Sequence, residues 1–255
     1  IRMTFCIGIK TEDGLIGIAD TRITTGSERI TARKITLHQN GNHSMFLTTS
    51  GLRAARDKAL TYFDEILLSE DHTFDRLYKA VNAFGDQIRR VSDEDSKWLV
   101  NSGLDVNIHA LVGGQFENDD EHKLYMIYPQ GNWVEVSRGS PYFVIGESRY
   151  GKPLLDRVLT YESSMADALK SGYLAFDATR ASASDVDFPL DVVVYKRDTY
   201  RMVEHRYEAA DLRELTKWWS ANIREAFQQA PSGWVGTILD QLGQSIPTEP
   251  APSGV

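Results

Sequence analysis

The chain has 255 residues, of which 42% are hydrophobic and 25% charged, a composition typical of a globular domain. Its formal net charge of −8 disfavours binding to nucleic acid or to anionic membranes, because both carry negative charge. No apolar run approaches the roughly 20 residues of a transmembrane helix, and no signal peptide is recognisable, so we expect a cytoplasmic protein.

The first half of the sequence alternates strand and helix signals in blocks. Four strands are predicted first, with a turn at Asp13-Gly14 between the first two, at 5–10, 15–20, 33–37 and 44–49. Apolar residues then recur at helical spacing, which predicts two helices, over 52–68 and from 74 to about 92.

The second half repeats this alternation. The predicted strands lie at 106–112, 123–128 and 133–136, and the predicted helices at 151–159 and from 164 to about 180. A final strand pair, 191–195 and 202–207, precedes a helix over 209–227. Blocks of strands separated by helix pairs favour an α+β fold with two stacked antiparallel sheets flanked by helices, a four-layer αββα sandwich.

The composition changes near residue 230, which predicts one domain over 1–230 and a Pro/Gly-rich tail over 231–255. Within this tail we expect one apolar face, formed by Trp234, Val235, Ile238, Leu239 and Leu242. Such a face is normally covered, either by the chain's own body or, as we prefer, by a neighbouring subunit.

Thr4 is the candidate nucleophile. An N-terminal threonine can attack an amide carbonyl with its hydroxyl while its own α-amine, with a reference pKa near 8, accepts the proton. Removal of Met3 would expose Thr4 in this way. While Ile1, Arg2 and Met3 precede it, the Thr4 nitrogen is a non-basic amide, so we expect that form to be inactive.

Three further residues fit a site around Thr4. Lys34 would lower the pKa of the threonine amine and hydroxyl, and Asp20 would keep that lysine charged and oriented. Gly51, between a strand and a helix, could direct a backbone N–H at a developing oxyanion. Each residue alone also has an ordinary structural interpretation as a turn, surface or helix-entry residue.

Together, Thr4, Asp20-Thr21-Arg22, Lys34 and Gly51 resemble the β-subunits of proteasomes. The stretch Gly146-Glu147-Ser148-Arg149-Tyr150-Gly151-Lys152-Pro153 is similar to a motif of Anbu, a bacterial ancestral group of these subunits. The resemblance covers roughly residues 3–230. It implies the αββα fold, self-assembly into rings or open helical turns, and threonine-dependent amide cleavage with Ser148 as a proton relay; the other interpretation of Ser148 is a helix N-cap.

The resemblance departs from the family pattern after residue 180. Ser182 falls where the family has an aspartate beside the threonine, and Asp185 falls where it has a serine. By the same alignment, Ile23, Thr49 and Arg53 are predicted to line the first substrate-binding pocket.

These observations predict a self-assembling threonine hydrolase that cleaves peptide or other amide bonds. A scaffold that has kept the fold without peptidase activity and a small-molecule amidase of the same superfamily remain open. The histidine spacing and the single cysteine predict neither a metal site nor any cofactor, and nothing in the sequence identifies an ATP-dependent unfoldase as a partner.

Overall fold

A computed structural model describes residues 4–25 and 28–243 of the chain. Chain contacts divide it into two compact units, Ile1–Leu212 and Arg213–Val255. The strands of the first unit are β1 (Phe5–Thr11), β2 (Gly14–Asp20), β3 (Arg22–Thr25), β4 (Glu28–Thr31), β5 (Ile35–Asn40), β6 (His43–Ser50), β7 (His109–Gln115), β8 (Lys123–Ile127), β9 (Trp133–Glu135), β10 (Tyr142–Gly146), β11 (Leu190–Lys196) and β12 (Met202–Tyr207).

The helices of the first unit fall into two pairs. They are α1 (Arg53–Glu70), the short 3₁₀ turn η1 (Asp71–Thr73) and α2 (Leu77–Val100), then α3 (Lys152–Val158) and α4 (Met165–Ser182). The second unit contains α5 (Arg213–Gln229) and α6 (Gly233–Gly243).

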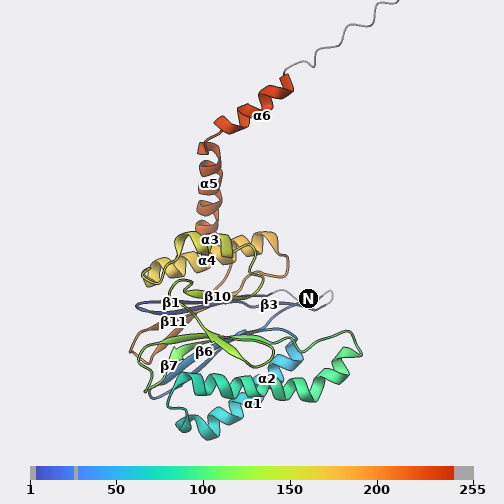
Figure 1. Cartoon of the computed structure of the whole chain (residues 1–255), viewed down its shortest axis with the longest axis vertical. Helices are drawn as coiled ribbons and strands as arrows, with labels where there is room; N and C mark the ends of the chain where they lie inside the picture. The colour runs from blue at the N-terminus through green and yellow to red at the C-terminus, as the bar shows by residue number, and fades with distance from the viewer. Residues whose placement is uncertain (1–3, 26–27, 244–255) are drawn as a thin grey trace, which may run out of the picture. The chain divides into compact units, whose positions relative to one another are not determined.

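Two antiparallel sheets of five strands form the centre of the first unit. One has the strand order β10-β1-β2-β11-β12 and the other β5-β6-β7-β8-β9, while β3 and β4 pair as a separate ribbon. Figure 1 shows four layers: α3 and α4, the first sheet, the second sheet, and then α1 and α2. The predicted αββα sandwich is therefore confirmed.

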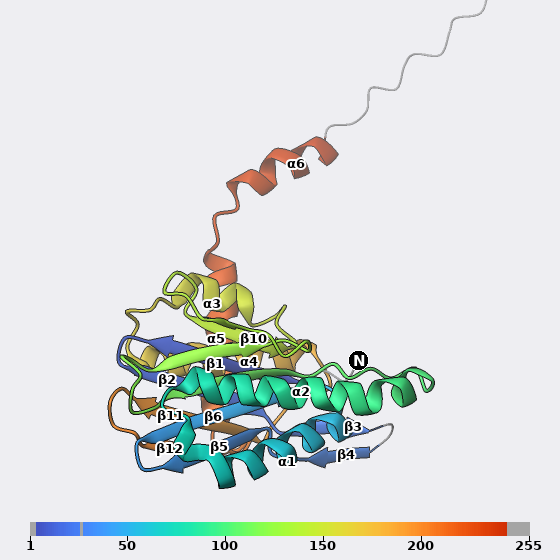
Figure 2. The same ribbon diagram turned by 60° about the horizontal axis from the view of Figure 1, so that its bottom comes forward.

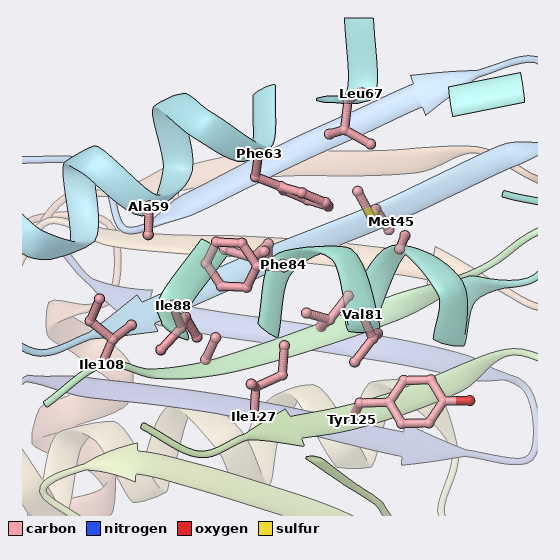
Figure 3. Close-up of a cluster of buried hydrophobic side chains, with 14 of the residues drawn as sticks. Met45, Ala59, Phe63, Leu67, Val81, Phe84, Ile88, Ile108, Tyr125 and Ile127 are labelled. Atoms are coloured by element: carbon pink, nitrogen blue, oxygen red, sulfur yellow. The ribbon is translucent and has the colours of Figure 1, made fainter. Parts of the chain in front are cut away.

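Two apolar clusters hold these layers together. One lies between α1, α2 and the second sheet, where Phe63, Phe84 and Ile127 are buried (Figure 3). The other lies between the sheets and includes Cys6 and Phe46, both with no exposed surface. Full burial of a phenylalanine or isoleucine side chain contributes about 1.5–3 kcal/mol to folding, so these clusters stabilise the sandwich.

Three parts of the secondary structure were not predicted from the sequence. The strands β3 and β4 pair with one another. Each has only four residues, which is too few for the alternation of apolar and polar residues to be recognised. The strand β10, which ends at Gly146, the first residue of the Anbu-like motif, was also not predicted, and it pairs with β1. The region taken as a tail contains α6, while residues 244–255 lie outside the described part of the chain.

The second unit presents apolar side chains on its surface. None of the residues of α5 is buried, and Phe227 is 80% exposed. In α6, the face of Trp234, Ile238 and Leu242 is also exposed. Within the described residues, no helix is both long and apolar enough to span a membrane.

Candidate active site

Thr4 lies at the start of β1, directly beside Asp20 at the end of β2. Its Oγ1 donates a hydrogen bond of 2.8 Å to Asp20 Oδ1, and the backbone N–H of Phe5 donates to the same oxygen at 2.8 Å. Thr4 is only 7% exposed. The β1–β2 hairpin, whose register pairs Cys6 with Ala19, therefore brings residue 4 and residue 20 together from 16 positions apart.

Lys34 reaches the same carboxylate from the start of β5. Its Nζ lies 2.7 Å from Asp20 Oδ1 and 2.8 Å from the carbonyl oxygen of Arg22. Both side chains are buried, and within the described residues Asp20 Oδ2 has no hydrogen-bond partner. Burial raises the pKa of Asp20, against the opposing effects of Lys34, Phe5 N–H and Thr4. Thr4, Asp20 and Lys34, which were predicted to meet, therefore form one buried cluster.

The strand β10 fixes Thr4 from its other side. Phe5 pairs with Gly146, and the backbone N–H of Glu147 donates to the Thr4 carbonyl at 2.7 Å. Gly146 has φ of +86°, and a Cβ there would lie 2.0 Å from the Thr4 carbonyl oxygen. A glycine is thus required where β10 passes the candidate nucleophile.

Gly51 follows the end of β6 and precedes α1. Its φ of +126° is accessible mainly to glycine, and a Cβ there would lie 2.2 Å from the carbonyl oxygen of Asn107. This conformation turns the peptide plane at the point where the chain leaves the sheet. Such a turn can present a backbone N–H to a bound oxyanion, the role predicted for Gly51.

Ser148 is half-buried and lies two residues after Gly146. Its backbone carbonyl accepts a hydrogen bond from Lys152 N, but the N-cap of α3 is Gly151. Ser148 is therefore not the N-cap of this helix, which was the structural alternative. Its position next to Glu147 places it one residue from a direct backbone contact with Thr4.

The segment after α4 is tied to the site through Arg22. Ser182 is the last residue of α4 and is exposed, and Asp185 is half-buried in the following turn. Arg22 Nη2 lies 2.7 Å from Asp187 Oδ2, and Arg22 Nη1 donates to the Ser184 carbonyl at 3.2 Å. Because the carbonyl of Arg22 also accepts from Lys34, this segment connects to the cluster through one residue.

Of the three predicted pocket residues, Thr49 is buried on β6, and its hydroxyl has no hydrogen-bond partner within the described part of the chain. The Arg53 side chain is 46% exposed and pairs with Asp57 at 3.3 Å. Ile23 belongs to β3, but its side chain lies outside the described residues.

Cys6 is fully buried, and burial raises the pKa of its thiol to about 12, so it is not a nucleophile. Among residues 4–25 and 28–243, no group of three or more His, Cys, Asp or Glu side chains is arranged to hold a metal ion.

Sequence reasoning missed contacts that depend on the backbone. The N–H of Phe5 and the N–H of Glu147 hold Thr4 in place, and no residue type signals them. It also missed Arg56, which is 5% exposed on the inner face of α1. The one available signal was its spacing of three and seven residues from the buried Ala59 and Phe63.

A buried threonine, aspartate and lysine at one end of an αββα sandwich define the proteasome-type N-terminal-nucleophile fold. A family model described as proteasome subunit matches residues 3–194. The chain therefore belongs to the proteasome subunit family, and its similarity to Anbu structures places it with the Anbu group within that family.

Several solved Anbu structures are similar over nearly their whole length. Anbu from Hyphomicrobium sp. strain MC1 is 31% identical, with 89% of this chain and 98% of that chain covered and a TM-score of 0.81. Anbu from Yersinia bercovieri is 30% identical, with 89% and 97% covered and a TM-score of 0.82. The helical assembly of the Anbu complex from Pseudomonas aeruginosa is 28% identical, with 89% and 97% covered and a TM-score of 0.84. A search of curated protein sequences returns no match.

Proposed function

We propose that this protein is a threonine-type hydrolase that cleaves peptide or other amide bonds once Thr4 carries a free α-amine. The observation that carries the proposal is the buried cluster in which Asp20 Oδ1 lies 2.8 Å from Thr4 Oγ1 and 2.7 Å from Lys34 Nζ. The ammonium group of Lys34 and the hydroxyl of Thr4 meet at one carboxylate oxygen, and a positive charge in this neighbourhood favours deprotonation of the hydroxyl because it stabilises the alkoxide.

In the proposed reaction the Thr4 oxygen bonds to the carbonyl carbon of the substrate. The hydroxyl proton passes to the Thr4 α-amine and then to the leaving nitrogen as the C–N bond breaks. Water subsequently attacks the resulting ester, releases the acid and returns the proton to Thr4. The backbone N–H of Gly51 would stabilise the oxyanion in both steps, and Ser148 would relay the proton.

Asp20 has a positioning role in this proposal. It contacts both Lys34 and the Thr4 hydroxyl, so it holds the ammonium group next to the nucleophile. The segment that carries Ser182 and Asp185 is connected to the cluster by Arg22, whose guanidinium donates to the Ser184 carbonyl and whose own carbonyl oxygen accepts from Lys34.

We further propose that the protein self-associates. The Pseudomonas aeruginosa relative is described as a helical assembly, and the exposed apolar face of α6 in this chain needs a cover. Sedimentation analysis of the full chain and of a Trp234→Ser/Leu242→Ser variant tests this. We expect smaller particles for the variant, and unchanged particles would remove α6 from the contact.

The hydrolase proposal is tested with protein whose first residue is Thr4. A peptide epoxyketone requires both a hydroxyl and a free α-amine on one residue, so intact mass should show one adduct per chain. The Thr4→Ala variant is the matched control and should show none. A chain with a free Thr4 that assembles normally yet forms no adduct would support the scaffold alternative instead.

A further inference from the structure

Glu147 carries a buried carboxylate next to Thr4. It follows Gly146 at the end of β10, and Figure 2 shows β10 beside β1 in the first sheet. Its backbone N–H donates to the Thr4 carbonyl at 2.7 Å, and only 3% of its side chain is exposed. An ionised carboxylate is rarely buried to this degree without a partner, because its removal from water is costly. The position therefore requires hydrogen-bond donors around the carboxylate.

Arg149 supplies these donors. Its backbone N–H and its Nε donate to Glu147 Oε1 at 3.1 and 2.9 Å, and its Nη2 donates to Glu147 Oε2 at 2.6 Å. The Arg149 side chain is 73% exposed, so its guanidinium covers the carboxylate from the solvent side. The hydrogen bonds from Arg149 outweigh the effect of burial and lower the pKa of Glu147, which is therefore ionised at neutral pH.

These contacts fix the peptide unit between Ser148 and Arg149. The N–H of this unit donates to Glu147 Oε1 at 3.1 Å, and its carbonyl, which belongs to Ser148, accepts from Lys152 N at 3.1 Å. Because both polar atoms are held, the peptide plane cannot rotate without breaking a hydrogen bond. The Cα atom of Ser148 lies in this plane, so the carboxylate of Glu147 helps to set the direction in which the serine side chain leaves the backbone.

Glu147 thus contacts the backbone of the nucleophile and the backbone of the proposed proton relay. Its own N–H holds the carbonyl of Thr4, and its carboxylate holds the N–H that follows Ser148. A proton relay needs a heavy-atom distance of about 2.6–3.2 Å, so a small rotation of the Ser148 peptide would interrupt it. The two contacts of Glu147 therefore link the position of the nucleophile to that of the relay.

We propose that Glu147 is a positioning residue whose carboxylate holds Ser148 in place relative to Thr4. The inference rests on the proposed hydrolase function and adds a residue to it. Glu147 acts through the backbone of its neighbours, and the Ser148 hydroxyl is the group that relays the proton. Removing the carboxylate should therefore slow the proton transfer without weakening substrate binding.

Amide hydrogen exchange tests the placement without requiring turnover. Glu147→Ala removes the acceptor of the Arg149 N–H, so this amide should exchange about tenfold faster, the change expected for the loss of one hydrogen bond. Glu147→Gln keeps an acceptor oxygen, so its exchange rate at Arg149 should lie between those of Glu147→Ala and the unsubstituted chain. The exchange is measured at single-residue resolution on the full chain.

Kinetics with Thr4 as the first residue test the catalytic consequence. For an aminomethylcoumarin peptide amide, Glu147→Ala should lower kcat by about a hundredfold, the size of one general acid–base contribution, and leave KM unchanged. Glu147→Gln should recover part of this loss. The variant Glu147→Ala/Ser148→Ala should lose no more activity than Ser148→Ala alone, because both substitutions interrupt the same relay.

The ion pair of Arg206 with Asp191 provides a matched control. Arg206 also places an exposed guanidinium on a buried carboxylate, with hydrogen bonds of 2.6 and 2.9 Å. Arg149→Gln should lower kcat about tenfold, because the Glu147 carboxylate loses its guanidinium partner, whereas Arg206→Gln should leave kcat unchanged. Thermal unfolding of both variants shows that the difference does not arise from stability, and equal losses of kcat in both would count against a specific role of the Glu147 pair.

The possible outcomes separate the two proposals. Unchanged exchange at Arg149 in Glu147→Ala, or a double variant whose loss is the product of the two single losses, would overturn the role of Glu147. If the exchange rises as expected but no form of the protein cleaves a peptide amide or forms an epoxyketone adduct, the hydrolase proposal fails and Glu147 still holds the Ser148 peptide. If Glu147→Ala turns over at the unsubstituted rate, the hydrolase proposal stands and the role of Glu147 fails.

Discussion

Lys34 Nζ and Thr4 Oγ1 contact the same oxygen atom of Asp20, at 2.7 and 2.8 Å. The Thr4 hydroxyl therefore donates a hydrogen bond to a carboxylate that is also paired with an ammonium group. The hydroxyl, carboxylate and ammonium are thus already together in this structure, and the proposed mechanism requires in addition a free α-amine on Thr4.

The nucleophile is tested first. In protein whose first residue is Thr4, Thr4→Ala should lower amide hydrolysis by roughly a thousandfold or more, because no other group can form the ester. Thr4→Ser keeps a hydroxyl and should retain measurable activity. Steady-state rates with unchanged thermal stability check this, and equal turnover by wild type and Thr4→Ala would remove the assignment.

The extension before Thr4 should control activity. With Ile1, Arg2 and Met3 attached, the nitrogen of Thr4 is an amide, so no epoxyketone adduct is expected. Cleavage after Met3 should yield one adduct per chain. The two forms are compared by intact mass after the same exposure to the probe, and equal labelling of both would contradict the proposed role of the amine.

Asp20 should be essential to catalysis. Asp20→Asn leaves an acceptor oxygen but removes the charge that balances Lys34, so we expect kcat to fall by about a hundredfold or more. Asp187→Asn, on the outer segment that pairs with Arg22, is the matched control and should reduce kcat much less. Comparable losses in both variants would indicate that the network acts as one unit.

Gly51 should tolerate no side chain. Gly51→Ala places a Cβ 2.2 Å from the Asn107 carbonyl oxygen at a φ of +126°, so the backbone must move. We expect a loss of stability of about 1–3 kcal/mol and, if the N–H binds the oxyanion, a fall in kcat of roughly a hundredfold. Gly41 lies in an open turn with φ of +57°, and a Cβ there would meet no atom within 4 Å. Gly41→Ala therefore shows the effect of backbone strain alone, without the displacement of a neighbouring backbone segment.

A second buried carboxylate, remote from Thr4, should make stability depend on pH. Asp71 accepts hydrogen bonds from His38, Asn40 and His43. Burial raises the pKa of Asp71, but the contacts with Asn40, His38 and His43 outweigh it, so the folded-state pKa lies below the ordinary 3.8.

Because this pKa is lowered by folding, Asp71 stabilises the protein above about pH 4, and the contribution disappears as the pH falls through the folded-state value. Asp71→Asn should cost about 1–3 kcal/mol at pH 7 and little near pH 2. Denaturant unfolding at several pH values measures this, with the exposed Asp120→Asn as control. A constant difference at all pH values would exclude an ionisation effect.

The sequence predicted the sandwich because its signals were local. Asp13-Gly14 marks the first hairpin, and helical spacing marks α1, α2 and α4. The proximity of Thr4 and Asp20 could also be predicted, because the two strands joined at that turn bring residues 4 and 20 to one end of the sheet. Lys34 was placed beside them by the resemblance to proteasome subunits. The four-residue strands β3 and β4 gave no periodic signal.

The remaining features depend on tertiary structure. The burial of Arg56 is not visible in the segment Arg53-Ala54-Ala55-Arg56 taken alone, since either arginine could face outward. Its one signal is the spacing of three and seven residues from Ala59 and Phe63, which does not show that a charged side chain is buried. The Glu147 N–H contact with Thr4 likewise requires the pairing of β10 with β1, which no local pattern indicates.

The backbone at Thr4 is held by hydrogen bonds that do not involve residues 1–3. Its carbonyl is held by Glu147 N–H and the next residue by Asp20, and all of these bonds lie on the carboxyl side of the peptide bond that would be cut. Removal of residues 1–3 should therefore leave Thr4 and the start of β1 in their original position. Activation would be a change of chemistry at one nitrogen atom, achieved without any refolding of the subunit.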